Sequence, residues 1–287
     1  MKYTILAGVL IFITLFNFNV ITESISLSFT VCINNLLPSL IPFLLLSNIL
    51  IQKGLFLDNP LSLTLLCFIS GSPNNSKLIK NYLDNSSISI NDSQKLLNYL
   101  QYINPIYVLN GIGLIALQNK KFGLIILISN LVSSLILGRF NKVTIKKFKI
   151  SDKNIFNIIT DSIKDTINTV LYIIGVITFF FMLTSFIDIN SKYKFIYGIF
   201  EITQGIHYLS VSHLTLYFKV VLATFFISFG GLSMHMQIFG ILDNKKISYK
   251  TYFINRIIHS ILSVTIVSIL FCILNWYQNL HQDINCF

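Results

Sequence analysis

Long stretches without charged residues are the feature that most constrains how this chain can fold. Asp, Glu, Lys and Arg make up only 11% of the 287 residues, whereas soluble domains carry about 25%. Six stretches contain none of these four residue types: 3–22, 24–52, 96–119, 166–187, 220–242 and 257–282. Each is long enough for the roughly 20-residue helix that crosses a bilayer. The sequence therefore predicts an all-α polytopic membrane protein, with 122–138 and 202–218 as shorter candidate spans.

The N-terminal stretch also has the outline of a signal peptide, because Lys2 precedes an apolar run. No small-residue cleavage site follows that run, and the next segment again resembles a membrane helix. We therefore expect 3–22 to be the first span and Glu23 to mark its far side.

A basic cluster accounts for much of the formal net charge of +10. Its members are Arg139, Lys142, Lys146, Lys147, Lys149 and Lys153. Positive residues in short loops mark the cytoplasmic side of a membrane protein, so we expect 139–153 to be a cytoplasmic linker. Binding to anionic lipid is the alternative interpretation. The expected surroundings are a lipid bilayer, and the charge does not indicate nucleic acid.

Nothing in the sequence indicates an enzyme or a metal site. The four cysteines, at positions 32, 67, 272 and 286, have neither close pairing nor metal-ligand spacing. No HExxH, Walker loop or Ser-His-Asp grouping is present. We therefore predict no catalytic residues, no cofactor and no metal.

The segment Ser70-Gly71-Ser72-Pro73-Asn74-Asn75-Ser76-Lys77 predicts a broken helix. Glycine and proline end helices, and Ser72 followed by Pro73 is typical of an N-cap and a first helical residue. At membrane depth such a break is tolerated where it lines a cavity or is buried in protein. The arms would be 61–70 and 73–83.

Prolines indicate further irregular helices. Pro38 and Pro42 would kink the second span or split it into halves. Pro105 disfavours helical geometry at Asn104, which predicts another discontinuous helix there. Asn104 would then satisfy backbone groups that Pro105 leaves open.

A second break is predicted at Gly230-Gly231-Leu232-Ser233-Met234-His235-Met236-Gln237. An offset of 159 residues aligns Gly71 with Gly230 and gives seven identities in the 19 positions 71–89. We therefore expect an internal repeat of discontinuous helices or re-entrant hairpins. Its parts would be a first half at 26–138, the linker 139–153, a second half at 154–274 and a loose tail at 275–287.

Paired broken helices in two halves of a chain indicate a transporter's binding site. The alternative is a duplicated bundle that keeps glycines for close helix packing. On the first interpretation the solute would contact both breaks and nearby polar groups. The candidate substrate-binding residues are Gly71, Ser72, Pro73, Asn74, Asn75, Lys77, Asn104, Pro105, Glu201, Gln204, Gly230, Gly231, Ser233, His235, Gln237 and Arg256.

Ionisable groups within spans mark a pathway or a buried pair. Lys77 could hold an anion beside the amides of the first break, or extend its ammonium group to an interface. Glu201 and Gln204 are three residues apart, which would place them on one helix face. They could bind a cation or proton, or clamp a ligand; alternatively they could be a buried pair that holds Arg256 or His235.

These segments resemble the YlbJ-like sporulation integral membrane proteins, which are related to the nucleoside-recognition (gate) domain family. The matching segments follow the family's order over about residues 30–275. They are Leu37-Pro38-Ser39-Leu40-Ile41-Pro42-Phe43, Ser70-Gly71-Ser72-Pro73 with Lys77, Asn104-Pro105 with Gly111-Ile112-Gly113, Glu201-Ile202-Thr203-Gln204-Gly205, Gly230-Gly231-Leu232-Ser233-Met234-His235-Met236-Gln237, and Arg256. The family usually has Ser-Gly-Tyr-Pro at the first break, where this chain has Ser72 in place of the tyrosine.

The resemblance implies an architecture like that of concentrative nucleoside transporters. It also implies a place in the membrane around the developing spore and transport of dipicolinate. The expected function is therefore a transporter or facilitator of a small anionic or aromatic solute, with a proton or sodium as coupling ion. The alternative is a non-transporting membrane scaffold for assembly of the spore envelope, which would use the basic linker.

Overall fold

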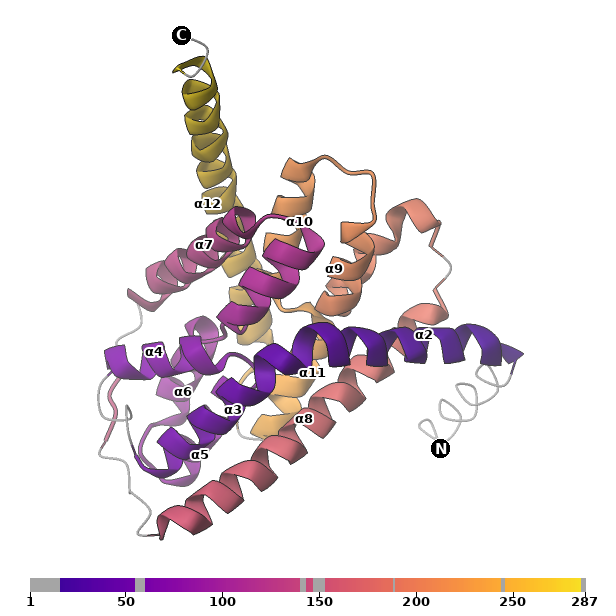
Figure 1. The fold of residues 1–287 in the computed structure, drawn as a ribbon. Coiled ribbons are helices and arrows are strands. Elements are labelled where there is room, and N and C mark those ends of the chain that lie inside the picture. The colour runs from indigo at the N-terminus through magenta and orange to yellow at the C-terminus, as the bar shows by residue number, and fades with distance from the viewer. Residues whose placement is uncertain are drawn as a thin grey trace.

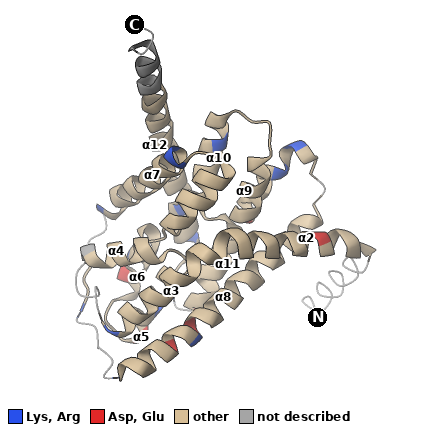
Figure 2. Ribbon diagram, viewed as in Figure 1, with Lys and Arg blue, Asp and Glu red and all other residues tan. Residues whose placement is uncertain are grey.

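The computed structural model describes residues 16–54, 60–139, 143–146, 153–187, 189–243 and 246–284. Every regular element in these ranges is helical and none is a strand (Figure 1). Within them, the helical runs long and apolar enough to cross a membrane are Phe18–Gln52, Lys120–Arg139, Ile155–Ser185, Leu216–Leu242 and Tyr249–Asn275. Most of the ribbon carries neither Lys, Arg, Asp nor Glu (Figure 2). The prediction of an all-α protein with several candidate spans is confirmed.

The first run consists of α2 (Phe18–Val31), a π-helical turn η1 (Cys32–Leu36) and α3 (Leu37–Gln52). Pro38 lies in the first turn of α3, and Pro42 lies inside the helix. Proline has no N–H to donate and its ring clashes with the preceding turn. The wider π turn before Pro38 accommodates this change, so the helix continues and is not split into halves.

The predicted helix boundary at Glu23 is wrong. Glu23 lies inside α2, and its side chain is exposed. Glutamate is a good helix former, so an exposed glutamate does not end a helix. The larger part of the predicted span 3–22 lies outside the described residues.

The predicted discontinuities in the next part of the chain are present. Helices α4 (Pro60–Ser70) and α5 (Asn74–Asp84) flank the first break, Gly71 to Pro73. Helix α6 (Ile90–Tyr99) is followed by the non-helical segment 100–104 and the π-helical η2 (Tyr107–Ala116). The chain thus leaves helical geometry at both predicted positions.

Helix α7 (Lys120–Arg139) precedes the predicted linker, of which only 139, 143–146 and 153 are described. Helix α8 (Ile155–Ser185) is 31 residues long and packs along α2 and α3 (Figure 1). It forms one side of the bundle (Figure 1).

The second half begins with a 3₁₀ helix, η3 (Ser191–Ile199), and α9 (Ile202–Ser210), which pack on each other. The candidate span 202–218 is wrong, because α9 has only nine residues and turns at its end. Helices α10 (Leu216–Phe229) and α11 (Gly231–Leu242) follow, on either side of the second break at Gly230.

The arms of the second break pack on different partners. Helix α10 packs against α12 (Tyr249–Ile284), whereas α11 packs against α5 and α8. Together α10 and α11 form a run long enough to cross a membrane. The second break therefore interrupts a candidate span and does not form the tip of a re-entrant hairpin. The predicted loose tail 275–287 is also wrong, because α12 continues to Ile284 and extends away from the bundle (Figure 1).

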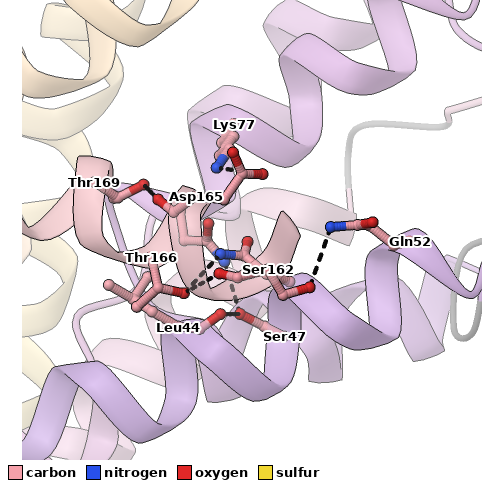
Figure 3. A network of polar contacts seen from close by, with 10 residues as sticks. Leu44, Ser47, Gln52, Lys77, Ser162, Asp165, Thr166 and Thr169 are labelled. Carbon is pink, nitrogen blue, oxygen red and sulfur yellow. Dashed lines mark hydrogen bonds and ion pairs between the residues drawn. The ribbon is translucent and has the colours of Figure 1, made fainter. Parts of the chain in front are cut away.

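Polar side chains join α3 to α8 inside the bundle (Figure 3). Asn48 Nδ2 donates to Thr166 Oγ1 at 3.1 Å, and Gln52 Nε2 donates to Ser162 Oγ at 3.1 Å. Such interhelical hydrogen bonds stabilise membrane bundles, in which apolar packing alone gives little preference. They fasten α3 to the N-terminal half of α8.

Gly71 is required at the first break by its conformation and by its neighbour. Its φ of +72° lies in the left-handed region, and a Cβ at this position would lie 2.8 Å from the backbone nitrogen of Asn104. A side chain is therefore excluded both by backbone strain and by direct overlap.

We predict that Gly71→Ala lowers the free energy of unfolding by roughly 1–3 kcal/mol. Gly175→Ala is the matched control, because a Cβ there would meet nothing within 4 Å. Alanine favours helix, so the control should leave stability unchanged or slightly higher. Thermal unfolding of the two purified variants in the same detergent tests this, and equal melting temperatures would contradict it.

Candidate functional site

The first break is held against the non-helical segment 100–104 that follows α6. The Ser72 N–H donates to Tyr102 O at 2.6 Å, and the Ser72 hydroxyl donates to Gln101 Oε1 at 2.6 Å. Asn75 Nδ2 donates to Leu100 O at 2.6 Å. These three bonds satisfy polar groups that helix interruption would otherwise leave open, and they fix the two segments together.

Ser72 is therefore not the N-cap that the sequence predicts. Helix α5 begins at Asn74, Pro73 occupies the cap position, and no side chain caps the helix. The reason is that Gln101 engages the Ser72 hydroxyl. Asn74 instead ties the start of α5 to α3, because its Nδ2 donates to Ser47 Oγ at 2.7 Å.

Lys77 forms a contact that the sequence did not suggest. Its Nζ lies 3.2 Å from Asp165 Oδ2 on α8, and the two side chains are 23% and 49% exposed (Figure 3). Both groups are partly solvated, so the ion pair itself contributes at most about 1 kcal/mol. Lys77 therefore joins α5 to α8 and is not placed beside the amides of the first break.

Carbonyl groups at the end of α10 are satisfied by side chains at the second break. Phe229 O accepts from His235 Nε2 at 3.0 Å and from Arg256 Nε at 3.3 Å. The Arg256 guanidinium also donates to Ser228 O and, at 3.4 Å, to Gln101 O. A helix C-terminus leaves such carbonyls open and carries partial negative charge. One buried arginine therefore links the second break to the segment that holds the first.

The other side of the second break contacts the start of α9. Gly230 and Gly231 have φ values of +95° and +58°, and the Ser233 N–H donates to Phe200 O at 2.8 Å. This bond places the second break beside Glu201, just as the Ser72 bond places the first break beside Asn104.

Glu201 is the N-cap of α9. Its Oε2 accepts the Gln204 N–H at 2.7 Å and the Thr203 hydroxyl at 2.5 Å. The alternative in which Glu201 and Gln204 hold Arg256 or His235 is wrong, because Arg256 and His235 bond carbonyls at the second break. The Glu201 and Gln204 side chains also do not bind a common partner. Gln204 Oε1 accepts from the Thr184 hydroxyl on α8 at 2.9 Å, whereas the Glu201 carboxylate caps α9.

Asn104 caps a helix start in a similar way. Its Oδ1 accepts the Ile106 N–H at 2.9 Å and the Tyr107 N–H at 3.2 Å. This confirms that Asn104 satisfies backbone groups beside Pro105. Each break therefore faces the capped start of another helix, one capped by an amide and one by a carboxylate.

Both breaks and both caps meet at a central cavity of about 40 Å³. The predicted site residues that line it are Ser72, Pro73, Asn104, Glu201, Ser233 and Gln237. The remaining lining is mainly apolar and was not found from the sequence: Leu36, Leu40, Ile103, Tyr107, Ile173, Ile177, Ile202, Thr203 and Met234. Leu36 and Leu40 flank Pro38, and that proline was a sequence signal from which they could have been found as cavity residues. No sequence signal pointed to the α8 isoleucines.

Two side-chain amide atoms in the lining of the central cavity have no hydrogen-bond partner. Asn104 Nδ2 and Gln237 Oε1 are buried and unbonded, and each residue is 2% exposed. The two bonds to Asn104 Oδ1 fix which way that amide points. Buried polar groups are normally satisfied, so a donor and an acceptor left open in one cavity indicate a polar occupant.

The other predicted site residues support the cavity from outside or lie elsewhere. Residues that shape or fasten the breaks are Gly71, Asn74, Asn75, Gly230, Gly231, His235 and Arg256. Pro105 follows Asn104 without lining the cavity, and Lys77 and Gln204 line other hollows.

Two further hollows lie along α8, one toward each end. The linker-side hollow, of about 380 Å³, is lined by Lys77, Lys80, Asn81, Asp165, Asn168, Thr169, Tyr172, Gly240, Ile241 and Asp243. The far hollow, of about 590 Å³, is lined by Asn17, Val20, Glu23, Ser24, Leu27, Thr184, Ser185, Phe186, Ile187, Lys194, Tyr197, Gln204 and Tyr208.

Helix α8 therefore passes three hollows in order. Asp165 lines the linker-side hollow, Ile173 and Ile177 line the central cavity, and Ser185 lines the far hollow. At 1.5 Å per residue, Asp165 to Ser185 spans about 30 Å, which equals the thickness of a bilayer's hydrocarbon core. The α8 residues that line the three hollows therefore span a membrane's hydrocarbon thickness.

The chain is similar in sequence to a known membrane protein. The chain is 22% identical over 298 residues to the sporulation integral membrane protein YlbJ of Bacillus subtilis (strain 168), covering 81% of this chain and 73% of the relative. No family model matches the chain, and no solved structure matches it. The similarity supports a YlbJ-like assignment, and with the apolar helices it supports an integral protein of the cell membrane.

We predict that Arg256→Met lowers the free energy of unfolding by roughly 1–3 kcal/mol, because it removes the buried hydrogen bonds from the guanidinium to Phe229 O, Ser228 O and Gln101 O. Arg256→Lys should recover part of the loss, since one ammonium cannot reach all three carbonyls. Arg139→Met, at an exposed position on α7, is the control. Thermal unfolding in detergent measures the effects; a melting temperature for Arg256→Met equal to that of the control would refute the assigned role.

Proposed function

We propose, on the premise that the chain is a YlbJ-like membrane protein, that it carries a small solute across the membrane through the central cavity. The observation that carries this proposal is the meeting of both helix breaks at one cavity, with hollows beyond it along α8. Discontinuous helices that meet near the bilayer midplane are typical of binding sites in secondary transporters. The name of the relative supports a role in spore formation.

The size of the central cavity suits a closed state of such a transporter. A cavity of about 40 Å³ holds a water molecule or an ion, since one water occupies about 30 Å³ in the liquid. An organic solute needs several times more room. Transport would therefore require the breaks to separate, and alternating access would open the cavity toward one hollow at a time.

The walls of the cavity suit a solute with a flat apolar body and polar ends. Leucine and isoleucine supply six of the fifteen lining residues, and Tyr107 adds an aromatic ring. The open N–H of Asn104 would donate to a carboxylate or a ring nitrogen, and Gln237 Oε1 would accept from a donor group. An anionic aromatic acid such as dipicolinate, which the family resemblance implies, has the flat body and the acceptor groups, whereas Gln237 Oε1 would need a separate donor or cation.

A membrane scaffold for spore-envelope assembly is the alternative function. It would use the basic linker 139–153, most of which lies outside the described residues. Neither the unpartnered amides nor the line of hollows has a purpose on that interpretation. A scaffold would tolerate changes in the cavity that leave membrane insertion intact.

We predict that Gln237→Met lowers solute flux about tenfold or more, which corresponds to losing one hydrogen bond worth about 1.5 kcal/mol. Uptake into proteoliposomes would be measured with dipicolinate, nucleosides and related aromatic acids. Asn255→Met is the control, because that amide bonds the Thr251 carbonyl of its own helix. Absence of flux and of binding for every compound, or equal flux in the two variants, would rule the proposal out.

A further inference from the structure

Glu201 is a buried carboxylate without a positively charged partner. It is 2% exposed, and among the described residues no Lys, Arg or His lies within ion-pair distance of it. A buried charge without a partner is costly. The α9 N-terminus and the Thr203 hydroxyl stabilise one carboxylate oxygen, but they do not neutralise the charge.

Groups on the surrounding elements do not supply a counter-charge. Those in electrostatic contact with Glu201 are Tyr107 of η2 and Cys32 of η1, which are neutral side chains at pH 7. Helices α2, η3 and α10 also pack against α9. The charged and titratable groups on these helices, on α9 itself and on the far side of the second break are Glu23, Lys192, Tyr193, Lys194, Tyr197, His207, Tyr208, Tyr217, Lys219, His235 and Arg256.

These groups are engaged or placed elsewhere. Glu23 and Lys194 line the far hollow, beyond Gln204. Lys219 donates to Ser210 O at the other end of α9, and Arg256 bonds carbonyls at the second break. Among the described residues that line the central cavity, Glu201 is therefore the one carboxylate, and no ammonium or guanidinium group accompanies it.

Oxygen atoms from other elements gather around the same cavity. Gln237 Oε1 is buried and has no partner, and the Ser72 and Ser233 side chains also line the cavity. Oxygen donors are what hard cations prefer. A cavity of about 40 Å³ accommodates a small ion. No group of three His, Cys, Asp or Glu in the described part of the chain could hold a multivalent metal.

We propose that the Glu201 side chain binds a monovalent cation, a proton or a sodium ion, in the central cavity. The binding site consists of the carboxylate, the open Gln237 Oε1 and the neighbouring serine hydroxyls. A proton would add to a carboxylate oxygen and leave a neutral acid; sodium would be held by the oxygen atoms as an ion. In both cases the charge of Glu201 is neutralised where the two breaks meet.

Neutralisation would couple cation and solute, and this step rests on the proposed function. An anion cannot occupy a small cavity beside an uncompensated carboxylate without strong repulsion. Once Glu201 has bound a cation, the cavity would admit an anionic solute next to the open Asn104 N–H when the breaks separate. The cation would then be a cosubstrate, and solute affinity would depend on its concentration.

Cation binding is tested on purified protein without any solute, so it stands or falls separately from transport. Sodium chloride replaces choline chloride at constant ionic strength, and the melting temperatures of wild type and Glu201→Gln are compared. Sodium binding should raise the wild-type value by about 5 °C at 100 times the dissociation constant. The variant should not respond, because its neutral amide keeps the cap but lacks the charge.

Proton binding gives a different signature. A proton held more tightly in the folded state stabilises the protein at low pH, and the stabilisation is lost as pH rises. The melting temperature of the wild type should then fall relative to that of Glu201→Gln between pH 5 and 8. The corresponding loss in free energy of unfolding is at most about 1.4 kcal/mol per pH unit. No response to sodium is expected in that case.

Equal responses of wild type and Glu201→Gln to both sodium and pH would overturn the proposal. If Glu201→Gln does not fold, the proposal is tested by comparing Gln237→Met with the wild type. Sodium titration by calorimetry should then show binding that Gln237→Met weakens, or infrared spectra of the wild type should show a protonated carboxyl band that disappears at high pH. Absence of both signals would equally refute it.

Discussion

Backbone groups released at two helix breaks are the constraint on which the rest of the structure depends. At membrane depth an unsatisfied N–H or C=O costs several kcal/mol, so each break must be matched by another part of the chain. The first break is matched by the non-helical segment 100–104, and the second by Arg256 and His235. Because Arg256 also bonds Gln101 O, the two breaks are held in one assembly. The central cavity lies where these segments meet, so its position follows from backbone satisfaction.

Much of this could be predicted from the sequence, since helix interruption is a local property. Glycine and proline locate the breaks at Gly71, Gly230 and Pro105, and charge-free stretches locate the membrane-length helices. What could not be predicted depends on distant partners. Ser72 resembles an N-cap until Gln101, 29 residues away, engages its hydroxyl. The prolines of α3 resemble a helix end until the π turn absorbs them. The apolar wall from α8 carries no signal, because isoleucine in a membrane helix is uninformative. The internal repeat stays a prediction.

The electrostatic character of the site shows the same limit. From the sequence, Lys77 follows the first break by one helical turn and indicates an anion site. In the structure its ion pair with Asp165 places it at the linker-side hollow, and the acidic group of the central cavity is Glu201. The direction in which a side chain leaves its helix, and not its spacing along the chain, decides which cavity a charged group lines. The cavity therefore has an open N–H donor from Asn104 beside an acid.

Whether the central cavity is closed depends on whether Glu201 is charged or neutralised. The bonds that join each break to its neighbour are individually worth about 1 kcal/mol, so separating the breaks is feasible, whereas α8 stays fastened to α3 by the Asn48 and Gln52 bonds. A charged and unpaired Glu201 would favour opening, because opening hydrates it; a neutralised Glu201 would favour closure. A cation at Glu201 would thus stabilise the occluded conformation itself. Cation binding and closure are then linked, and the two open amides beside Glu201 give the solute its part in the same equilibrium.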